Sequence, residues 1–222
     1  MALPKKTITT EIVGTFEKTQ EVEFAKDLLV KGIVRLTMRW GKSKSVGTGL
    51  KKKMAAPVDL DLSEFACNAD YECPNIDSIN FFAHLECLNG AIKHSPDARD
   101  GGGEEWIEID FAKLPPEIAV LVTTASNFNG QQHLGMVNDA EIILNYGESG
   151  ELKCPISENQ ELQNHKAAAF VVFEKKDNDN WALKVEPTII ELNETKCAES
   201  LEELCLYFGL NPMDLKQTYP GC

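Results

Sequence analysis

Alternation of apolar and polar side chains with a period of two is the feature that most constrains how this chain can fold. It is clearest in residues 33–40, where Val34, Leu36, Met38 and Trp40 fall on one side and Arg35, Thr37 and Arg39 on the other. Successive side chains of a β-strand point to opposite faces, whereas a helix needs a period of about 3.6 residues. The segment therefore predicts a strand that packs against a core on one side.

The same signal recurs along the chain and predicts the fold class. Similar alternation marks residues 79–85, 106–111, 140–144 and 181–185, and more continuous apolar runs at 118–124 and 168–173 indicate central strands covered on both faces. Turn-forming residues separate these segments, as in Asn89-Gly90, Pro115-Pro116 and Asn129-Gly130. We therefore expect an all-β chain: a two-sheet antiparallel β-sandwich with a few short peripheral helices.

One of those helices is expected near the C-terminus, in residues 197–210. A helical stripe places Cys197, Leu201, Leu204, Cys205 and Phe208 on one face, and Gly209 supplies a stop. The apolar face has two interpretations. It docks onto the sandwich, or it serves as a surface for a partner or for self-association.

A glycine-rich acidic loop follows a His-Ser-Pro turn and is the first candidate site. Residues 97–105 contain four carboxylates, from Asp97, Asp100, Glu104 and Glu105, together with three glycines. Glycine lets the backbone adopt φ > 0 and turn its carbonyls inward. Ca²⁺ prefers oxygen ligands from flexible carboxylates, carbonyls and water. The loop therefore indicates a calcium cradle, with a solvated acidic turn as the alternative.

A second pair of carboxylates lies upstream, in residues 58–65. If this segment is a strand, Leu60 and Leu62 enter a core while Asp59 and Asp61 share the other face. Gathering these charges beside the acidic loop would be costly without a counter-ion. A shared cation resolves that cost, and the alternative is an amphipathic strand with a solvated acidic face.

Composition excludes some classes of function. The balance of 22 basic against 35 acidic residues, a formal net charge of −13, argues against a general nucleic-acid binder. The first residues contain no apolar stretch typical of a secretory signal, and the longest apolar runs are too short to cross a bilayer. We expect a cytoplasmic protein without a transmembrane segment.

Cysteines and lysines suggest weaker alternatives. Seven cysteines without regular spacing favour reduced thiols over a disulfide framework. Cys67, Cys73, His84 and Cys87 could form a zinc site, but no CxxC pair supports one. The lysine-rich segment 41–53 lacks the order of a phosphate-binding loop, so a solvated loop is favoured over a phosphate or acidic-partner contact.

Several motifs occur in an order that resembles a known family. They are Asp-Leu-Asp-Leu-Ser-Glu-Phe at 59–65, Ile-Asn-Phe-Phe at 79–82, Gly-Ala-Ile-Lys-His-Ser-Pro-Asp at 90–97, and Glu-Trp-Ile-Glu-Ile-Asp-Phe at 105–111. Together with the loop between the last two, they resemble the TerD family of tellurium-resistance and stress-response proteins. The likeness covers roughly residues 20–187, flanked by an N-terminal extension, 1–19, and a C-terminal helical extension, 188–222.

This resemblance implies a β-sandwich with Ca²⁺ held by loops at one end. Asp59 and Asp61 match the family's Asp-Leu-Asp strand, Asp97 its loop's opening acid, and Glu104-Glu105 its closing acids. Pro96 and Ala98 depart from the family's Gly and Asn, and the repeat that follows is shortened to Gly101-Gly102-Gly103. Fewer ligands suggest one site rather than two, or a vestigial one. We hypothesise that Asp59, Asp61, Asp97, Asp100 and one of Glu104 or Glu105 share one Ca²⁺.

The function expected from the resemblance is a non-catalytic, calcium-binding stress-response module that acts through protein partners. The alternative is a structural or assembly module with a degenerate metal loop, which contacts partners through its C-terminal helix. No nucleophile elbow, histidine-rich metal motif or dinucleotide-binding loop points to an enzyme.

Overall fold

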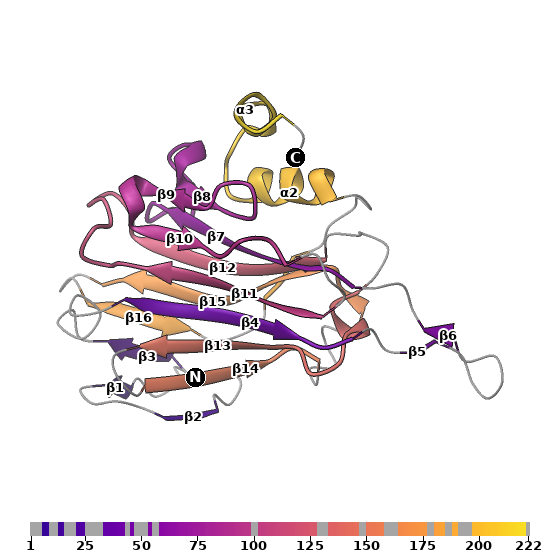
Figure 1. Ribbon diagram of the computed structural model, residues 1–222. Helices are drawn as coiled ribbons and strands as arrows, with labels where there is room; N and C mark the ends of the chain where they lie inside the picture. The colour runs from indigo at the N-terminus through magenta and orange to yellow at the C-terminus, as the bar shows by residue number, and fades with distance from the viewer. Residues whose placement is uncertain are drawn as a thin grey trace.

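The structure is a computed structural model, and it describes most of the strand-forming sequence. The described residues are 6–8, 13–15, 21–24, 33–42, 45–46, 53–54, 58–98, 102–127, 133–146, 150–157, 164–176, 180–184, 188–190 and 197–220. Their strands form two sheets packed face to face, with two helices beside one of them (Figure 1). The predicted two-sheet sandwich is confirmed.

The first sheet contains the two most buried strands. Its order is β1 (Lys6–Ile8), β3 (Glu21–Phe24), β16 (Trp181–Lys184), β15 (Ala167–Lys175), β12 (Val120–Asn127), β7 (Leu60–Cys67) and β8 (Ile79–Asn80), and β17 (Thr188–Ile190) also pairs with β15. Neighbours are antiparallel except β1 and β3. The predicted central strands at 118–124 and 168–173 are β12 and β15, which lie inside the sheet.

The second sheet packs against the first. Its order is β2 (Val13–Thr15), β14 (Gly150–Pro155), β13 (Glu141–Tyr146), β4 (Val34–Trp40), β11 (Gly103–Ile109), β10 (Ile92–His94) and β9 (Glu86–Cys87). All its neighbours are antiparallel except β2 and β14. A separate short pair is made by β5 (Ser45–Val46) and β6 (Lys53–Met54). Short 3₁₀ turns lie at Ile76–Ser78, Leu88–Gly90 and Leu134–Met136.

The space between the sheets is the main core. Leu36 and Met38 of β4, Leu62 of β7 and Ile107 of β11 are completely buried there. On the opposite face of β4, Arg39 is exposed and Arg35 is half-buried, as the alternation predicts, whereas Thr37 is buried. Burying such side chains supplies about 25 cal/mol per Å² of apolar surface, which is the main favourable term for the sandwich.

Strand β7 is covered on both faces. The alternative interpretation of this segment, an amphipathic strand with a solvated acidic face, is therefore wrong. Leu60, Leu62 and Ala66 belong to the core between the sheets. Phe65 and Cys67 point the other way, into a second apolar cluster under the C-terminal helices. Figure 1 shows those helices beside β7 and β8.

The predicted C-terminal helix is confirmed as α2 (Cys197–Tyr207). It ends in a Schellman motif, because Leu210 N donates to Cys205 O at 2.8 Å and Gly209 N donates to Leu206 O at 3.1 Å. Gly209 has φ of +75°, a conformation that favours glycine. Its apolar face docks on the chain's own sheet: the Phe208 ring, just beyond the helix, stacks on Phe65 with centroids 4.3 Å apart.

A second helix, α3 (Pro212–Thr218), was not predicted. Asn211 is its N-cap and accepts a hydrogen bond from Met213 N at 3.0 Å, while Pro212 occupies the first turn. This Asn-Pro pair is a helix-start signal that the sequence offered. No helix among the described residues is long and apolar enough to span a membrane.

One predicted strand is wrong in extent. Residues 79–85 do not form a continuous strand: β8 stops at Asn80, and β9 begins at Glu86. Phe81 N donates to His84 O at 3.4 Å and His84 N to Phe81 O at 2.9 Å, which closes a tight turn. Apolar residues continue through this turn because the C-terminal helix α3 covers it, with Tyr219 packed edge-on against Phe81.

Candidate metal site

Three carboxylates from three segments converge at one edge of the sandwich. Asp61 lies on β7, Asp97 in the loop after β10, and Glu105 on β11. One carboxylate oxygen of each lies within 4.8 Å of the others. The site joins the two sheets, since β7 belongs to the first sheet and β11 to the second.

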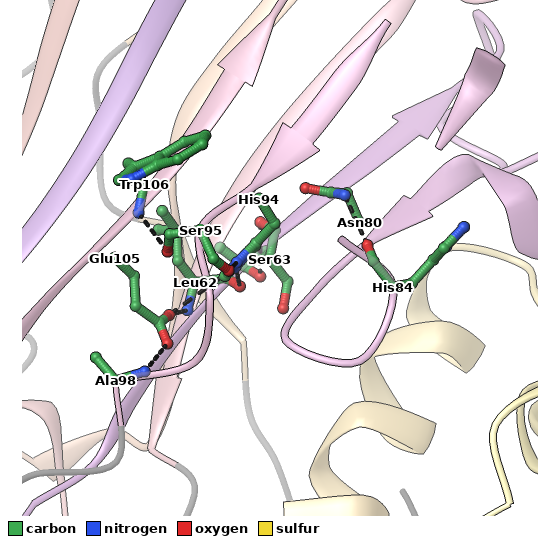
Figure 2. Close-up of polar contacts among 10 residues, drawn as sticks. Leu62, Ser63, Asn80, His84, His94, Ser95, Ala98, Glu105 and Trp106 are labelled. Carbon is green, nitrogen blue, oxygen red and sulfur yellow. Dashed lines mark hydrogen bonds and ion pairs between the residues drawn. The ribbon is translucent and has the colours of Figure 1, made fainter. Parts of the chain in front are cut away.

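The edge of β7 explains how Glu105 is held. Strand β8 pairs with β7 only at Glu64 and Phe65, so the backbone of Leu62 lies beyond the end of β8. Leu62 N donates to Glu105 Oε2 at 2.9 Å, and Ala98 N donates to Glu105 Oε1 at 3.2 Å (Figure 2). Two backbone donors therefore fix the orientation of one buried carboxylate.

His94 satisfies the other backbone group of Leu62. Its Nε2 lies 2.9 Å from Leu62 O, and its Nδ1 lies 2.6 Å from Ser95 O. Nε2 is also 3.9 Å from Glu105 Oε2. Burial lowers the pKa of His94, opposed by the two carbonyls. With both ring nitrogens against acceptors, His94 ties β10 to β7, a role that the sequence interpretation missed.

Burial and mutual repulsion raise the carboxylate pKa values. The pKa of Glu105 rises to about 7, mainly through burial, although the hydrogen bonds from Leu62 and Ala98 oppose the rise. The pKa of Asp61 lies well above its usual range, through burial first and then through the charges of Glu105, Asp59 and Asp97. Ionising these groups together is therefore unfavourable unless a cation compensates.

Asp59 contributes charge from the half-buried position just before β7. Its charge raises the pKa of both Asp61 and Glu105, so it belongs to the electrostatic environment of the cluster. Asp59 is not among the three residues whose ligand atoms converge.

Glu104 and Glu105 separate onto opposite faces of β11. Arg39 Nε donates to Glu104 Oε2 at 2.6 Å, in an exposed pair on the outer surface of the second sheet. Asp61, Asp97 and Glu105 are thus brought together, whereas Glu104 points away. Asp100 lies outside the described residues.

The end of the acidic loop is shaped by glycine and by packing. Gly102 has φ of +137°, as the glycine-rich sequence predicts. A Cβ added at Gly103 would lie 3.1 Å from atoms of Ala98 and of Trp40. The Ala98 side chain therefore packs against the core, while its backbone N–H donates to Glu105.

The four residues of the zinc alternative do not form one cluster, although Cys67 and Cys73 lie close together. Among the described residues, only Asp61, Asp97 and Glu105 form a group of three or more potential metal ligands whose ligand atoms lie within 4.8 Å of one another. His84 Nδ1 instead lies 2.7 Å from Ile79 O. The segment 41–53 of the basic loop lies largely outside the described residues.

Comparison with known sequences and structures decides the family. A sequence model of the TerD domain matches residues 13–186. The chain belongs to the TerD family. The resemblance found in the motifs is thereby confirmed, including the stretch that carries Asp61, Asp97 and Glu105.

Individual TerD relatives are distant. The chain is 33% identical to the uncharacterized protein YceE of Bacillus subtilis over 88 residues. This aligned stretch covers 37% of the present chain and 46% of YceE. It is 28% identical to the tellurium resistance protein TerZ of Serratia marcescens over 127 residues, which are 56% of the present chain and 63% of TerZ. The chain thus matches about half to two thirds of the length of these relatives.

Solved structures share the fold. The crystal structure of SAV2460, a protein of unknown function, superposes with a TM-score of 0.58 at 16% identity, covering 72% of this chain and 89% of that one. A homologue of telluride resistance protein TerD, SCO6318 from Streptomyces coelicolor A3(2), gives 0.57 at 17% identity, covering 72% and 90%.

Proposed function

We propose that Asp61, Asp97 and Glu105 bind one Ca²⁺ ion. The convergence of their carboxylate oxygens within 4.8 Å carries this proposal. Asp61 and Glu105 are almost fully buried, at 6% and 1% exposure. Hard cations prefer such oxygen donors, and a divalent charge offsets the repulsion that raises their pKa values.

The donor set fits one site rather than two. Ca²⁺ takes six to eight oxygens, and carboxylates bind through one or both of theirs. Three carboxylates leave room for backbone carbonyls and water to complete the shell, with Asp59 adding nearby negative charge. The hydrogen bonds from Leu62 N and Ala98 N leave Glu105 oriented toward its two partners.

A cation at this edge would join the two sheets to the loop after β10. It would order one end of the sandwich, and a protein partner could recognise that ordered surface. We therefore propose a non-catalytic, calcium-binding stress-response module acting through protein partners. The tellurium resistance protein TerZ is one relative of the domain, and relevance to tellurium is part of the same proposal.

The geometry favours a binding role over catalysis. A general base needs a free nitrogen or oxygen aimed at a reacting group. Both ring nitrogens of His94 face carbonyl oxygens, and both oxygens of Glu105 accept backbone hydrogen bonds. These residues are committed to holding the site together.

Assembly through the C-terminal helices is the second candidate. The buried face of α2 packs on the chain's own sheet, so a partner would have to use the other side. Leu206, Tyr207 and Met213 are exposed there, at 61%, 60% and 57%. Light scattering on wild type and on Leu206→Ser/Tyr207→Ser tests this: assembly predicts a larger mass that the double variant loses, and a monomeric wild type argues against it.

Calcium titration by calorimetry tests the leading proposal. Wild type should bind one equivalent, and Asp61→Asn or Glu105→Gln should weaken binding by at least about tenfold, because each removes a charged ligand. Glu104→Gln is the matched control, since Glu104 pairs with Arg39 on the outer face and should leave the affinity unchanged. Wild type that gives no heat of calcium binding would sink the proposal.

A further inference from the structure

Two thiols lie side by side under the C-terminal helices, away from the acidic site. Cys67 is the last residue of β7, and Cys73 follows the turn after it. Their Sγ atoms are 3.4 Å apart, and both side chains are buried. Neither residue takes part in the proposed calcium site.

The turn between them fixes this approach. Asn68 N donates to Glu72 O at 2.9 Å, which closes the neck of the loop next to the two cysteines. Inside the loop, Asn68 Oδ1 accepts from Asp70 N at 2.9 Å and from Glu72 N at 3.1 Å. The two sulfurs, 3.4 Å apart, would have to close to about 2.05 Å to form a disulfide bond.

We propose that Cys67 and Cys73 are a redox-active dithiol that closes to an intramolecular disulfide. With hydrogen peroxide as oxidant, one thiol is oxidised to a sulfenic acid as the O–O bond breaks and one water leaves. The second thiol then attacks that sulfur, forms the S–S bond and releases the second water. The two sulfurs give up two electrons in all, and a dithiol reductant reverses the step by exchange.

The C-terminal segment packs over this pair. Cys73 N donates to Phe208 O at 2.9 Å, and Phe208 stacks on Phe65, two residues before Cys67. The hydrogen bond with Cys67 and burial both raise the pKa of Cys73. Since the thiolate is the reactive form, this raised pKa and the cover should slow oxidation of the pair.

The disulfide would in turn hold the surface on which the C-terminal segment rests. A Cβ at Gly209 would lie 3.2 Å from Glu72 Cγ, so the turn after Cys67 packs directly against the end of α2. Closing the S–S bond restricts the unfolded chain and fixes that turn. Oxidation should therefore stabilise the docked arrangement of α2 and α3.

Peptide mapping of the full chain in chelator tests the proposal independently of calcium. Peroxide treatment, alkylation and digestion with a glutamate-specific protease would cut after Glu64 and Glu72, so the peptides holding Cys67 and Cys73 stay joined only through a disulfide. The joined pair should appear with peroxide and vanish with a dithiol reductant. Oxidation should also raise the melting midpoint by about 5 °C.

Matched variants sharpen the result. Cys67→Ser and Cys73→Ser should each lose the joined peptides and the shift in melting, whereas Cys154→Ser, at another buried cysteine, should keep both. Cys67 and Cys73 recovered separately alkylated after peroxide, or Cys73 joined instead to Cys205, would overturn the proposal. The wild-type map decides the question even if a serine variant fails to fold.

Discussion

Replacing Glu64 by Gln should change how the stability of this protein depends on pH. Glu64 lies on the core-facing side of β7 and is completely buried. Thr123 Oγ1 donates to its Oε2 at 2.6 Å, while its Oε1 has no hydrogen-bond partner. Burial raises the pKa of Glu64 from an ordinary value of 4.5 to about 8. Gln has nearly the same shape and cannot ionise.

The sign and size of the effect follow from that pKa. Between about pH 5 and about pH 8 the folded protein keeps the Glu64 proton while the unfolded chain has lost it, so stability falls as pH rises. At about 1.4 kcal/mol for each pH unit between the two pKa values, the loss reaches about 5 kcal/mol. The stability of Glu64→Gln should lack this part of the decline.

Urea unfolding from pH 5 to pH 9 in chelator measures the effect. The free energy of unfolding of wild type minus that of Glu64→Gln should fall across this range. Taking this difference cancels the contributions of Asp61 and Glu105, which both proteins share. Glu108→Gln is the control, because Glu108 is partly exposed and pairs with Arg35 at 2.6 Å; its difference from wild type should stay nearly constant. A constant difference for Glu64→Gln would refute a protonated, buried Glu64.

Three further predictions concern packing and the acidic site. Phe208→Ala should cost about 3–5 kcal/mol of unfolding free energy in urea, since it empties a buried ring site, whereas exposed Leu206→Ala should cost less than about 0.5 kcal/mol. Asp61→Asn should raise the melting midpoint in chelator, because it removes a carboxyl group whose ionisation is opposed first by burial and then by the neighbouring carboxylates. It should also abolish the rise of about 5–10 °C that calcium at about one hundred times Kd gives wild type, whereas Glu104→Gln should keep that rise. Gly103→Ala should cost about 1–3 kcal/mol and weaken calcium binding in calorimetry, because the added methyl group would press on the Trp40 ring and on Ala98, whose N–H holds Glu105.

Strand prediction succeeded where one face of a strand meets the core and the other meets solvent. In β4, Leu36 and Met38 are buried while Arg39 is exposed, so hydrophobicity reports the side directly. In β7 this relation fails, because α2 is distant in the sequence and covers the second face. Nothing local to the odd-numbered face of β7, which carries Asp61 and Phe65, reveals that cover. Glu64 instead shares the core-facing side with Leu62 and Ala66, where a carboxyl group is not expected.

The candidate site was predicted in part through motif order and in part through charge. Sequence left Glu104 and Glu105 as equivalent choices. The alternation of β11 distinguishes them, since Ile107 and Ile109 are buried and Glu105 shares their parity. The role of His94 could not be predicted from the sequence. It depends on the backbone carbonyl of Leu62, which is left without a strand partner on that side because β8 pairs only with Glu64 and Phe65.

A high-resolution crystal structure grown with calcium tests the central claim most directly. The account predicts a single strong peak, with a calcium anomalous signal, between Asp61, Asp97 and Glu105. All three carboxylates should lie about 2.3–2.6 Å from it. A well-ordered site in which these oxygens meet only water at hydrogen-bond distances, with calcium in the crystal, would contradict the proposal that this cluster is a calcium site.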